Sequence, residues 1–338
     1  MSAAVLNIAV LGVTTLVGEA VLAHLAEAEI GLGQLYMLST GEAVGSELQF
    51  KYQDKIVTDV DDFDFSLVQV AIFAASAELS ARIAPVAVAA GCVVIDTSPH
   101  FRQDSGVPLV VVGVNEAVLT DSGKLSIIAS PCAVSMHLAL SLKPLASEFG
   151  LVSVNVSTYQ SVSGSGRAGV DELAEQTRAI FSLNETENNV YSKRISFNIL
   201  PQVGDLMDNG YSIEEMKLIN ETQKVLALPD LVVNPTAVRV PVFYGHGQSV
   251  QVITSKPVSV GLSTALWQQQ TGVLVADAED GVYPTPVDVV GCDDVFVGRI
   301  RGAMGSQPGL NYWLVADNIH SGVALNSVRI VNVLKDLL

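Results

Sequence analysis

Cys132, Arg239 and His246 are the side chains with the clearest chemical potential in this sequence. Cys132 follows an apolar, strand-like run and Pro131, and it stands at the start of the helical pattern AVSMHLALSLKPL. The N-terminus of a helix carries unpaired N–H groups and a partial positive charge, which favour the nucleophilic thiolate over the thiol. The other interpretation is a buried structural cysteine, which is the commoner role of an isolated cysteine.

A thiolate nucleophile needs an acid or a base nearby, and an arginine can bind a carboxylate or phosphate through two parallel hydrogen bonds. His246 follows Arg239 by seven residues in VRVPVFYGHGQ. This odd spacing places the two side chains on opposite faces of an ideal strand. A bulge at Pro241 or a turn at Tyr244-Gly245 is therefore needed to bring them together. Taken alone, each residue fits a surface or hydrogen-bonded role better.

Weaker signals surround these three residues. Gln160 precedes a Gly164-Ser165-Gly166 turn, where backbone N–H groups could bind an anion. Glu214 and Lys217 lie one helical turn apart, which is typical of an exposed ion pair. Arg102 follows the run VIDTSPHF, at the strand ends where α/β proteins bind ligands.

The stretch GVTTLVG, residues 12–18, lies where an apolar strand changes to a helical pattern. Such a turn is typical of a dinucleotide-binding loop, whose middle glycine lets the backbone approach a pyrophosphate. That position is Thr15, a β-branched residue that adds bulk and restricts φ. Weakened cofactor binding is the expected result.

The composition indicates a compact protein without nucleic acid as a partner. The chain has 338 residues, of which 49% are hydrophobic and 16% charged, and its net charge is −17. Binding to nucleic-acid phosphates needs clustered Lys and Arg, so this negative charge argues against nucleic acid as a partner. We interpret the charge as serving solubility. No apolar run has the roughly 18 residues of a membrane span, and no signal peptide is recognised. The 3 cysteines are widely spaced and form no CxxC pair, so we expect no metal site and no disulfide. Free thiols fit a reducing compartment, so a cytoplasmic location is expected.

Near-continuous apolar runs alternate with helical patterns in the first third of the chain. This arrangement predicts a parallel sheet covered on both faces. The predicted strands are 5–13, 35–39, 68–75, 92–98 and 125–130, and the predicted helices are 16–27, 77–90 and 133–148.

The pattern then changes to long alternating runs at 152–164 and 233–258, which predict a mainly antiparallel sheet with one covered face. Helices are expected at 168–182, 212–227 and 322–337. The fold class is α/β: a Rossmann-like, doubly wound domain and an α+β domain, to which the family resemblance given next assigns catalysis and dimerisation. The first comprises residues 1–132, completed by the helix 322–338, and the second residues 133–321.

Taken together, the chain resembles the aspartate-β-semialdehyde dehydrogenases over essentially its full length. The segments that carry the resemblance are the GxxxxxG loop, SPHFR, the strand–Cys132–helix unit, STYQSVSGSGRAGVDELAEQT, FNILPQ, YSIEEMKLINETQKVL, VNPTAVRVPVFYGH and WLVADNIHSG.

The resemblance implies an enzyme of amino-acid biosynthesis that uses NADPH to convert β-aspartyl phosphate to aspartate β-semialdehyde and phosphate. It implies that a cysteine thiolate attacks the acyl phosphate and that the resulting thioester accepts hydride. The implied roles are nucleophile for Cys132, acid/base for His246 and orientation of the substrate for Gln160. Arg239 would hold the substrate carboxylate, and Glu214 would hold its amino group. Arg102 and Lys217 would bind the phosphate.

The cofactor-binding positions that the resemblance implies are Gly12, Thr14, Thr15, Leu16, Val17, Gly18, Ser39, Ser163, Gly164 and Asn318. Relatives carry glycine at the position of Thr15 and an arginine for the 2′-phosphate after the second strand. Here Ser39 is followed by Thr40, Gly41 and Glu42, with no arginine and an added carboxylate. NADP is the expected cofactor, with NAD as the alternative. Relatives also have asparagine at Pro131 and glutamate at Gln248.

Three functional hypotheses follow. The first is a homodimeric semialdehyde dehydrogenase that acts on a small molecule and needs no metal, nucleic acid or membrane. The second is a divergent paralogue branch of the family, weakened in catalysis and acting as a binding or regulatory partner of an active dehydrogenase. The third is thiol chemistry at Cys132 without hydride transfer.

Overall fold

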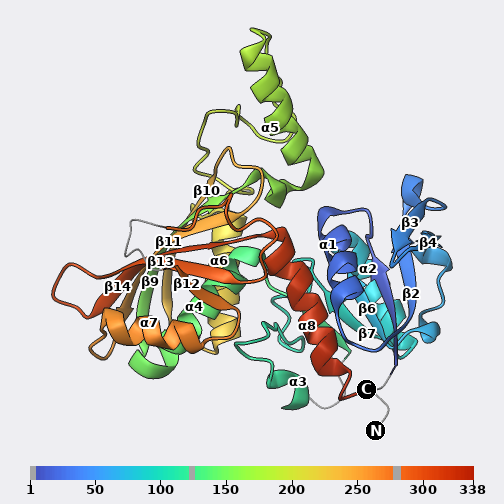
Figure 1. Ribbon diagram of the computed structural model, residues 1–338, viewed down its shortest axis with the longest axis horizontal. Helices are drawn as coiled ribbons and strands as arrows, with labels where there is room; N and C mark the ends of the chain where they lie inside the picture. Colours follow the sequence, from blue (N-terminus) through green and yellow to red (C-terminus); the bar gives the residue numbers. More distant parts are fainter. Residues whose placement is uncertain (1–4, 122–125, 277–282) are drawn as a thin grey trace. The chain divides into compact units, whose positions relative to one another are not determined.

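The computed structural model describes residues 5–121, 126–276 and 283–338. The chain divides into two compact units, one of Met1–Cys132 with Val323–Leu338 and one of Ala133–Gly322 (Figure 1). Within the described ranges, no helix combines the length and the apolarity that crossing a bilayer requires.

The first unit is built on a six-stranded sheet with the order β5-β2-β1-β6-β7-β8. All neighbouring strands are parallel. The near-continuous apolar sequences of β1, β6 and β7 are buried, as strands covered on both faces require. The bounds are β1 Leu6–Leu11, β2 Leu32–Ser39, β5 Thr58–Asp59, β6 Val70–Phe73, β7 Val93–Asp96 and β8 Ile127–Ala129.

Helices cover both faces of this sheet, which confirms the doubly wound prediction. The chain moves one way across the sheet from β1 through α1 (Leu16–Glu27) to β2, and the opposite way from β6 through α2 (Ala77–Ala89) to β7. Because crossovers are right-handed, α1 and α2 lie on opposite faces. The C-terminal helix α8 (Leu325–Leu334) packs beside α1 and belongs to this unit. Three short elements, β3 Glu47–Phe50, β4 Gln53–Ile56 and α3 Val118–Asp121, complete the unit.

The second unit contains a six-stranded mixed sheet with the order β10-β9-β11-β14-β13-β12. The three central pairs are antiparallel and the two outer pairs are parallel, so the sheet is mainly antiparallel, as predicted. Parallel neighbours need a long crossover. For β9 and β10 the chain supplies it through α5 and α6. The bounds are β9 Leu151–Gln160, β10 Val232–Arg239, β11 His246–Thr254, β12 Val273–Ala276, β13 Val295–Gly302 and β14 Gly309–Ala316.

Three helices pack on one face of this sheet: α4 (Ala133–Phe149), α6 (Ile213–Leu226) and α7 (Val260–Gln269). Trp267 of α7 and Tyr312 of β14 are fully buried between the helices and the sheet. Helix α5 (Gly166–Phe181) instead extends away from the sheet (Figure 1).

Several boundaries differ from the sequence predictions. The predicted strand 233–258 is interrupted at 240–245, and the predicted strand 152–164 ends at Gln160 because the turn η4 (Val162–Ser165) follows. The predicted helix 322–337 is a π-helical segment, η5 (Ile319–Ala324), followed by α8. Residue 125 of the predicted strand 125–130 lies outside the described residues.

Candidate active site

The turn from β1 to α1 has the local geometry of a phosphate-binding loop. Gly12 has φ +84°, and a Cβ there would lie 2.2 Å from the Ala74 carbonyl oxygen. A Cβ on Gly18 would lie 2.1 Å from the Gly12 carbonyl oxygen. These two glycines therefore provide the tight turn and the close helix–strand packing of a dinucleotide loop.

Thr15 is the N-cap of α1, and this role changes the interpretation of the altered loop. Its φ of −80° is ordinary for a β-branched residue, so its backbone is not strained, and weakened cofactor binding stays a prediction. Its Oγ1 accepts from the Gly18 N–H (3.0 Å) and lies 2.9 Å from the Gly12 carbonyl oxygen. The N–H groups of Leu16 and Val17 remain in the first helical turn, where such groups bind phosphate. Thr14 and Thr15 are exposed beside them.

The ends of β2 and β7 place the other predicted residues of the first unit. β2 ends at buried Ser39, and Glu42 follows on an exposed turn. Arg102 lies in the loop after β7, is 5% exposed and donates from Nη2 to the Thr97 carbonyl oxygen (2.6 Å). Burial raises the pKa of nearby Asp96, while hydrogen bonds and the Arg102 charge oppose that shift.

Cys132 directly precedes helix α4, as the sequence predicts, and it is half-buried. Its thiol can therefore reach solvent or substrate while lying at the positive end of a helix dipole. Cys92 differs sharply, because it lies next to β7 in the core and its burial raises the pKa of the thiol to about 12. Cys132 is thus the better candidate nucleophile.

In the second unit, a turn brings Arg239 and His246 into one buried cluster. Arg239 ends β10 and His246 begins β11, and Gly245 between them has φ +84°. The Arg239 Nη1 donates to the Ser161 carbonyl oxygen (2.7 Å), and the Ser161 N–H donates to His246 Nδ1 (3.2 Å). A Cβ on Gly164 would lie 2.8 Å from Arg239 Nη1 and 3.4 Å from His246 Nε2. The absence of a side chain at Gly164 therefore allows its backbone to lie close to both groups.

Gln160 joins this cluster to helix α6. It lies opposite Arg239 in the parallel register of β9 and β10. Its Nε2 lies 3.4 Å from Glu214 Oε1, and Glu214 Oε2 lies 3.4 Å from Lys217 Nζ. The Glu214 and Lys217 side chains are 16% and 30% exposed, so the pair is partly buried and differs from the expected surface ion pair. The Glu214 carboxylate can accept hydrogen bonds from a cationic group, and the Arg239 guanidinium and the Lys217 ammonium can bind anionic groups.

Asn318 and Ser163, which were predicted to bind the cofactor, lie in a buried polar network next to His246. Asn318 Oδ1 accepts from the Gly245 N–H (3.0 Å), and its Nδ2 donates to Ser163 Oγ (3.0 Å). Ser161 Oγ lies 3.1 Å from Asn318 Oδ1 and 3.0 Å from His246 Nδ1. Ser161 was not predicted, although it stands directly after Gln160 in the motif STYQSVSGSGR.

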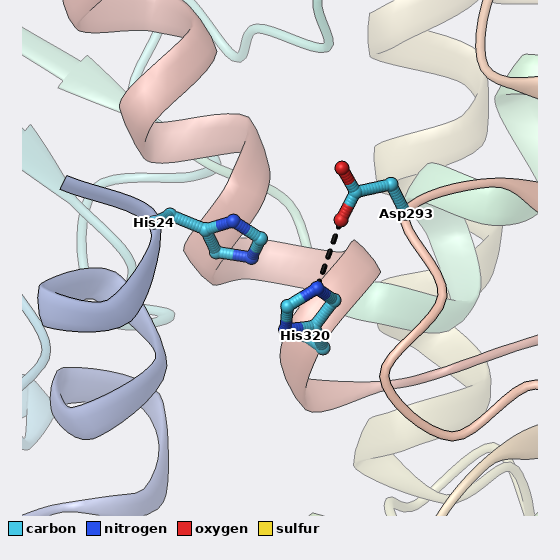
Figure 2. Close-up of side chains that lie close together, drawn as sticks. All are labelled: His24, Asp293 and His320. Atoms are coloured by element: carbon cyan, nitrogen blue, oxygen red, sulfur yellow. Dashed lines mark ion pairs between the residues drawn. The ribbon is translucent and has the colours of Figure 1, made fainter. Parts of the chain in front are cut away.

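The segment that carries Asn318 is anchored on both sides. Asp317 Oδ1 accepts from the N–H groups of Ile319 and His320, at 2.8 and 2.9 Å, and its Oδ2 accepts from the Gly291 N–H (2.9 Å). His320 Nε2 and Asp293 Oδ1 form an ion pair at 2.8 Å (Figure 2). These contacts hold the Asn318 backbone in place without involving its side chain.

A second buried histidine, His137 of α4, lies near this network. Its Nε2 is 3.5 Å from Ser321 Oγ. Burial lowers the pKa of His137 to about 4, although the charge of Asp317 and a hydrogen bond to the Ser321 backbone partly oppose this shift. The pKa of His246 lies well below its usual value. The main cause is burial, followed by the charges of Arg239 and His137. Both imidazoles are therefore neutral near neutral pH.

We expect acid to destabilise the fold through these histidines. An unfolded histidine binds a proton below about pH 6.5, whereas buried His137 does not bind one until about pH 4, so stability falls as the pH falls through this window. Between about pH 7 and pH 5, one such histidine costs on the order of 2 kcal/mol. The variant His137→Gln should lose less stability than the wild type in urea unfolding at these two pH values.

The control for this experiment is His100→Gln, because His100 is exposed. It should keep the wild-type dependence of the unfolding free energy on pH. An unchanged dependence in His137→Gln would contradict the prediction.

Comparisons with known proteins support the family that the motifs indicate. Residues 7–122 match the family described as semialdehyde dehydrogenase, NAD binding domain, and residues 142–321 match the semialdehyde dehydrogenase dimerisation domain. Aspartate-semialdehyde dehydrogenase 2 of Vibrio cholerae is 42% identical over 329 residues, 97% of either chain. The aspartate-semialdehyde dehydrogenase of Legionella pneumophila is 42% identical over 332 residues, 98% of this chain and 96% of the relative.

Solved structures agree with these matches. The crystal structure of aspartate semialdehyde dehydrogenase II from Vibrio cholerae has a TM-score of 0.95 and 42% identity, covering 97% of this chain and 98% of that chain. A second structure of that protein, complexed with ASA, gives the same values. The aspartate semialdehyde dehydrogenase of Candida albicans, with 22% identity and a TM-score of 0.76, shares the fold. The chain therefore belongs to the aspartate-semialdehyde dehydrogenase family.

Proposed function

We propose that this protein reduces β-aspartyl phosphate to aspartate β-semialdehyde and phosphate, through a thioester on Cys132. The observation that carries the proposal is the buried cluster of Gln160, Arg239 and His246, joined through Ser161, in a chain that matches aspartate-semialdehyde dehydrogenases along 97% of its length. Such a cluster can bind a carboxylate and serve a reacting carbonyl group.

In the proposed mechanism, the Cys132 thiolate adds to the acyl carbonyl and forms a C–S bond. The carbonyl electrons move to oxygen and return as the C–O bond to phosphate breaks, which leaves a thioester. Hydride addition then gives a second oxyanion, whose collapse releases the aldehyde and regenerates the thiolate. His246 is the proposed acid/base and hydrogen-bonds to the oxyanion at both additions, and Gln160 orients the acyl group.

Four charged residues are proposed to hold the substrate. Arg239 binds the carboxylate with its guanidinium, and Glu214 accepts hydrogen bonds from the ammonium group. Arg102 and Lys217 bind the phosphate. Fixing three charged groups converts the attack of Cys132 into an effectively unimolecular step.

The loop between β1 and α1 fits a nicotinamide dinucleotide, because Gly12 and Gly18 provide the tight turn and the close helix–strand packing and α1 presents its N-terminus. The residues proposed to hold this cofactor are Gly12, Thr14, Thr15, Leu16, Val17, Gly18, Ser39, Ser163, Gly164 and Asn318. When bound, the cofactor supplies the hydride. NADP is proposed as the cofactor. NAD is the alternative, because Glu42 adds a negative charge after β2 that would repel the 2′-phosphate of NADP.

The variant Glu42→Arg is expected to raise the affinity for NADP. Replacing a repelling carboxylate with a guanidinium that pairs with the 2′-phosphate is worth about 1.5–3 kcal/mol, or roughly ten- to a hundredfold in Kd. Affinity for NAD, which lacks this phosphate, should change little. Fluorescence titration with both dinucleotides measures the difference.

The control is Glu47→Arg, which makes the same charge change at an exposed position of β3. Equal gains for NADP in the two variants would mean that net charge is responsible. Equal gains for NADP and NAD in Glu42→Arg would show that the side chain does not face the 2′-phosphate.

The proposed function is tested with purified protein, aspartate semialdehyde and either NADP or NAD. Reduction of the cofactor should require phosphate, or arsenate in its place. No turnover with either cofactor at high concentration would reject the proposal. Labelling of Cys132 by an electrophile that the cofactor does not influence would then favour thiol chemistry without hydride transfer.

The alternative of a non-catalytic partner is not favoured. Its main motivation was the altered dinucleotide loop, and Thr15 caps α1 there without backbone strain. The relatives at 41–42% identity are named as dehydrogenases. Membership in a divergent paralogue branch stays a prediction.

The protein is proposed to act as a homodimer formed by its second unit. The match to the dimerisation domain over residues 142–321 supports this. An apolar patch around the end of α5 supports it further, because exposed apolar patches mark interfaces. The patch is the ring pair Phe181 and Phe197, whose centroids lie 5.8 Å apart, with Leu183 and Ile199 two residues after each in the chain; the four are 77%, 62%, 95% and 60% exposed, respectively. Native mass measurement should give twice the 35.6 kDa chain mass, and Leu183→Glu should shift the protein toward monomer.

A further inference from the structure

The hydroxyl group of Tyr191 is buried in the second unit without a hydrogen bond. Tyr191 lies in the segment that follows α5, and its side chain is half-buried. Its Oη makes no hydrogen bond of ordinary geometry with the described residues. The ring packs against a small apolar cluster formed by Val162, Leu173, Ile195 and Leu200. Buried polar groups in folded proteins nearly always have a partner, so this hydroxyl calls for an explanation.

A buried carboxylate on α5 fixes the backbone that carries Tyr191. Glu172 is 5% exposed and accepts from the N–H groups of Asn189 (2.7 Å) and Val190. The same carboxylate lies 3.4 Å from the N–H of Tyr191 itself and accepts from it. Hydrogen bonds to a carboxylate are stronger than those between neutral groups. The Tyr191 side chain therefore starts from a well-defined position.

The first turn of α5 leaves room for the hydroxyl at Gly169. A Cβ on Gly169 would lie 2.8 Å from Tyr191 Oη and 2.6 Å from the Val162 carbonyl oxygen. It would also lie 2.9 Å from the Cβ of Ser165. A side chain at position 169 would therefore displace the hydroxyl. The hydroxyl lies where α5 meets η4, the turn that follows β9.

Arg239 contacts the same turn. A Cβ on Gly164 of η4 would lie 2.8 Å from Arg239 Nη1. Burial raises the pKa of Tyr191, and the Ser165 side chain and the charge of Arg239 oppose this rise. Burial lowers the pKa of Arg239, and Tyr191 and then Glu214 oppose that shift. Tyr191 and Arg239 are thus close enough to interact electrostatically.

The two groups together suit an anion. Near neutral pH the Tyr191 hydroxyl keeps its proton and can donate it, and a guanidinium only donates. Two neighbouring donors can share one acceptor group with several lone pairs, and a carboxylate is such a group. Arg239 is the residue proposed above to bind the carboxylate of the substrate.

We propose that the Tyr191 hydroxyl donates a hydrogen bond to the substrate carboxylate held by Arg239, and that Tyr191 is a specificity-determining residue. The inference rests on the proposed function and deepens it. The hydroxyl is unpaired in the free protein and gains its acceptor when the substrate binds. A site with such a donor discriminates against analogues that lack the acceptor, because the buried group then stays unpaired.

The first test measures binding without turnover. L-2-aminobutyrate keeps the carboxylate and amino groups of aspartate semialdehyde but has no aldehyde, and propylamine lacks the carboxylate as well. In NMR titrations, Tyr191→Phe should bind L-2-aminobutyrate roughly tenfold more weakly than the wild type, the value of one hydrogen bond to a charged group. The two proteins should bind propylamine equally.

Equal affinities of the two proteins for L-2-aminobutyrate would overturn the inference, and so would a wild type that does not bind it. The titration needs neither cofactor nor phosphate, so its result is separate from the fate of the proposed function. A protein without dehydrogenase activity that shows the tenfold difference would reject the proposed function and keep the carboxylate contact.

The second test uses the reaction. Tyr191→Phe should raise KM for aspartate semialdehyde about tenfold and keep kcat within about threefold, because the contact is made in the bound substrate and in the transition state alike. For 3-aminopropanal, which has no carboxylate, kcat/KM should equal the wild-type value. An equal loss of kcat/KM for both aldehydes would mean that Tyr191 only supports the structure, which would contradict the inference.

The free protein supplies the third measurement. Removing an unpaired buried hydroxyl removes a cost, so ligand-free Tyr191→Phe should melt at or above the wild-type temperature. A melting temperature several degrees lower would show that the hydroxyl already has a partner, against the inference. The matched control is Tyr52→Phe, which removes a hydroxyl from a residue that is 97% exposed. It should match the wild type in binding, kinetics and melting.

Discussion

Replacing Cys132 with alanine is expected to lower the rate of phosphate-dependent semialdehyde oxidation by at least about 10³-fold. The sulfur is the atom that bonds to the acyl carbon in the proposed mechanism, and no other described thiol lies at a helix N-terminus. Removing the half-buried Sγ leaves the backbone of α4 unchanged, so binding of substrate and cofactor should persist. Initial rates of cofactor reduction and a dinucleotide titration measure the two effects.

The matched control is Cys292→Ser. Cys292 is also half-exposed, and its Sγ lies 3.9 Å from the Asp288 carbonyl oxygen. It should keep its rate within about twofold, as surface substitutions usually do. Similar rates for Cys132→Ala and Cys292→Ser, in proteins with equal melting temperatures, would remove Cys132 from the mechanism.

The second large effect is expected for Arg239→Leu. The guanidinium is 5% exposed, and truncating one partner of a buried ion pair costs about 2–5 kcal/mol. We therefore expect kcat/KM to fall by about 10²–10³-fold. Arg239→Lys should recover only part of this loss, because a lysine cannot reproduce two parallel hydrogen bonds to a carboxylate.

The control is Arg178→Leu on α5, which removes the same charge from an exposed position. It should leave kcat/KM near the wild-type value. If both variants lose activity equally, the effect comes from the net charge of the protein and not from a contact with the substrate.

The first unit could be predicted well because its elements depend on local sequence. Runs such as VQVAIFAA have few polar residues, so only a strand buried on both faces accommodates them. The second unit was harder. In β13, Arg299 has φ +54° and the register shifts between Gly298 and Arg301, so the alternation that identifies a strand is interrupted.

At the site, the sequence pointed to residues with distinctive side chains but not to those that act through the backbone. Arg239 and His246 could be named from the chemistry of their side chains. Their spacing showed that a turn or bulge must join them, but the sequence did not give the geometry of that turn. Ser161 escaped because its N–H is common to every residue except proline. The capping role of Thr15 was missed because its hydrogen bond depends on where Gly18 lies.

One residue, Ser161, receives the guanidinium of Arg239 on its carbonyl oxygen and directs its N–H to His246. The group proposed to recognise the substrate carboxylate and the group proposed to stabilise the reacting oxygen therefore share one support. Because Arg239 contacts Ser161, a movement of Arg239 upon engaging a carboxylate would act on the same residue whose N–H contacts the imidazole. Aldehydes without that carboxylate should consequently be discriminated against in turnover number as well as in binding, because specificity would be expressed in the transition state.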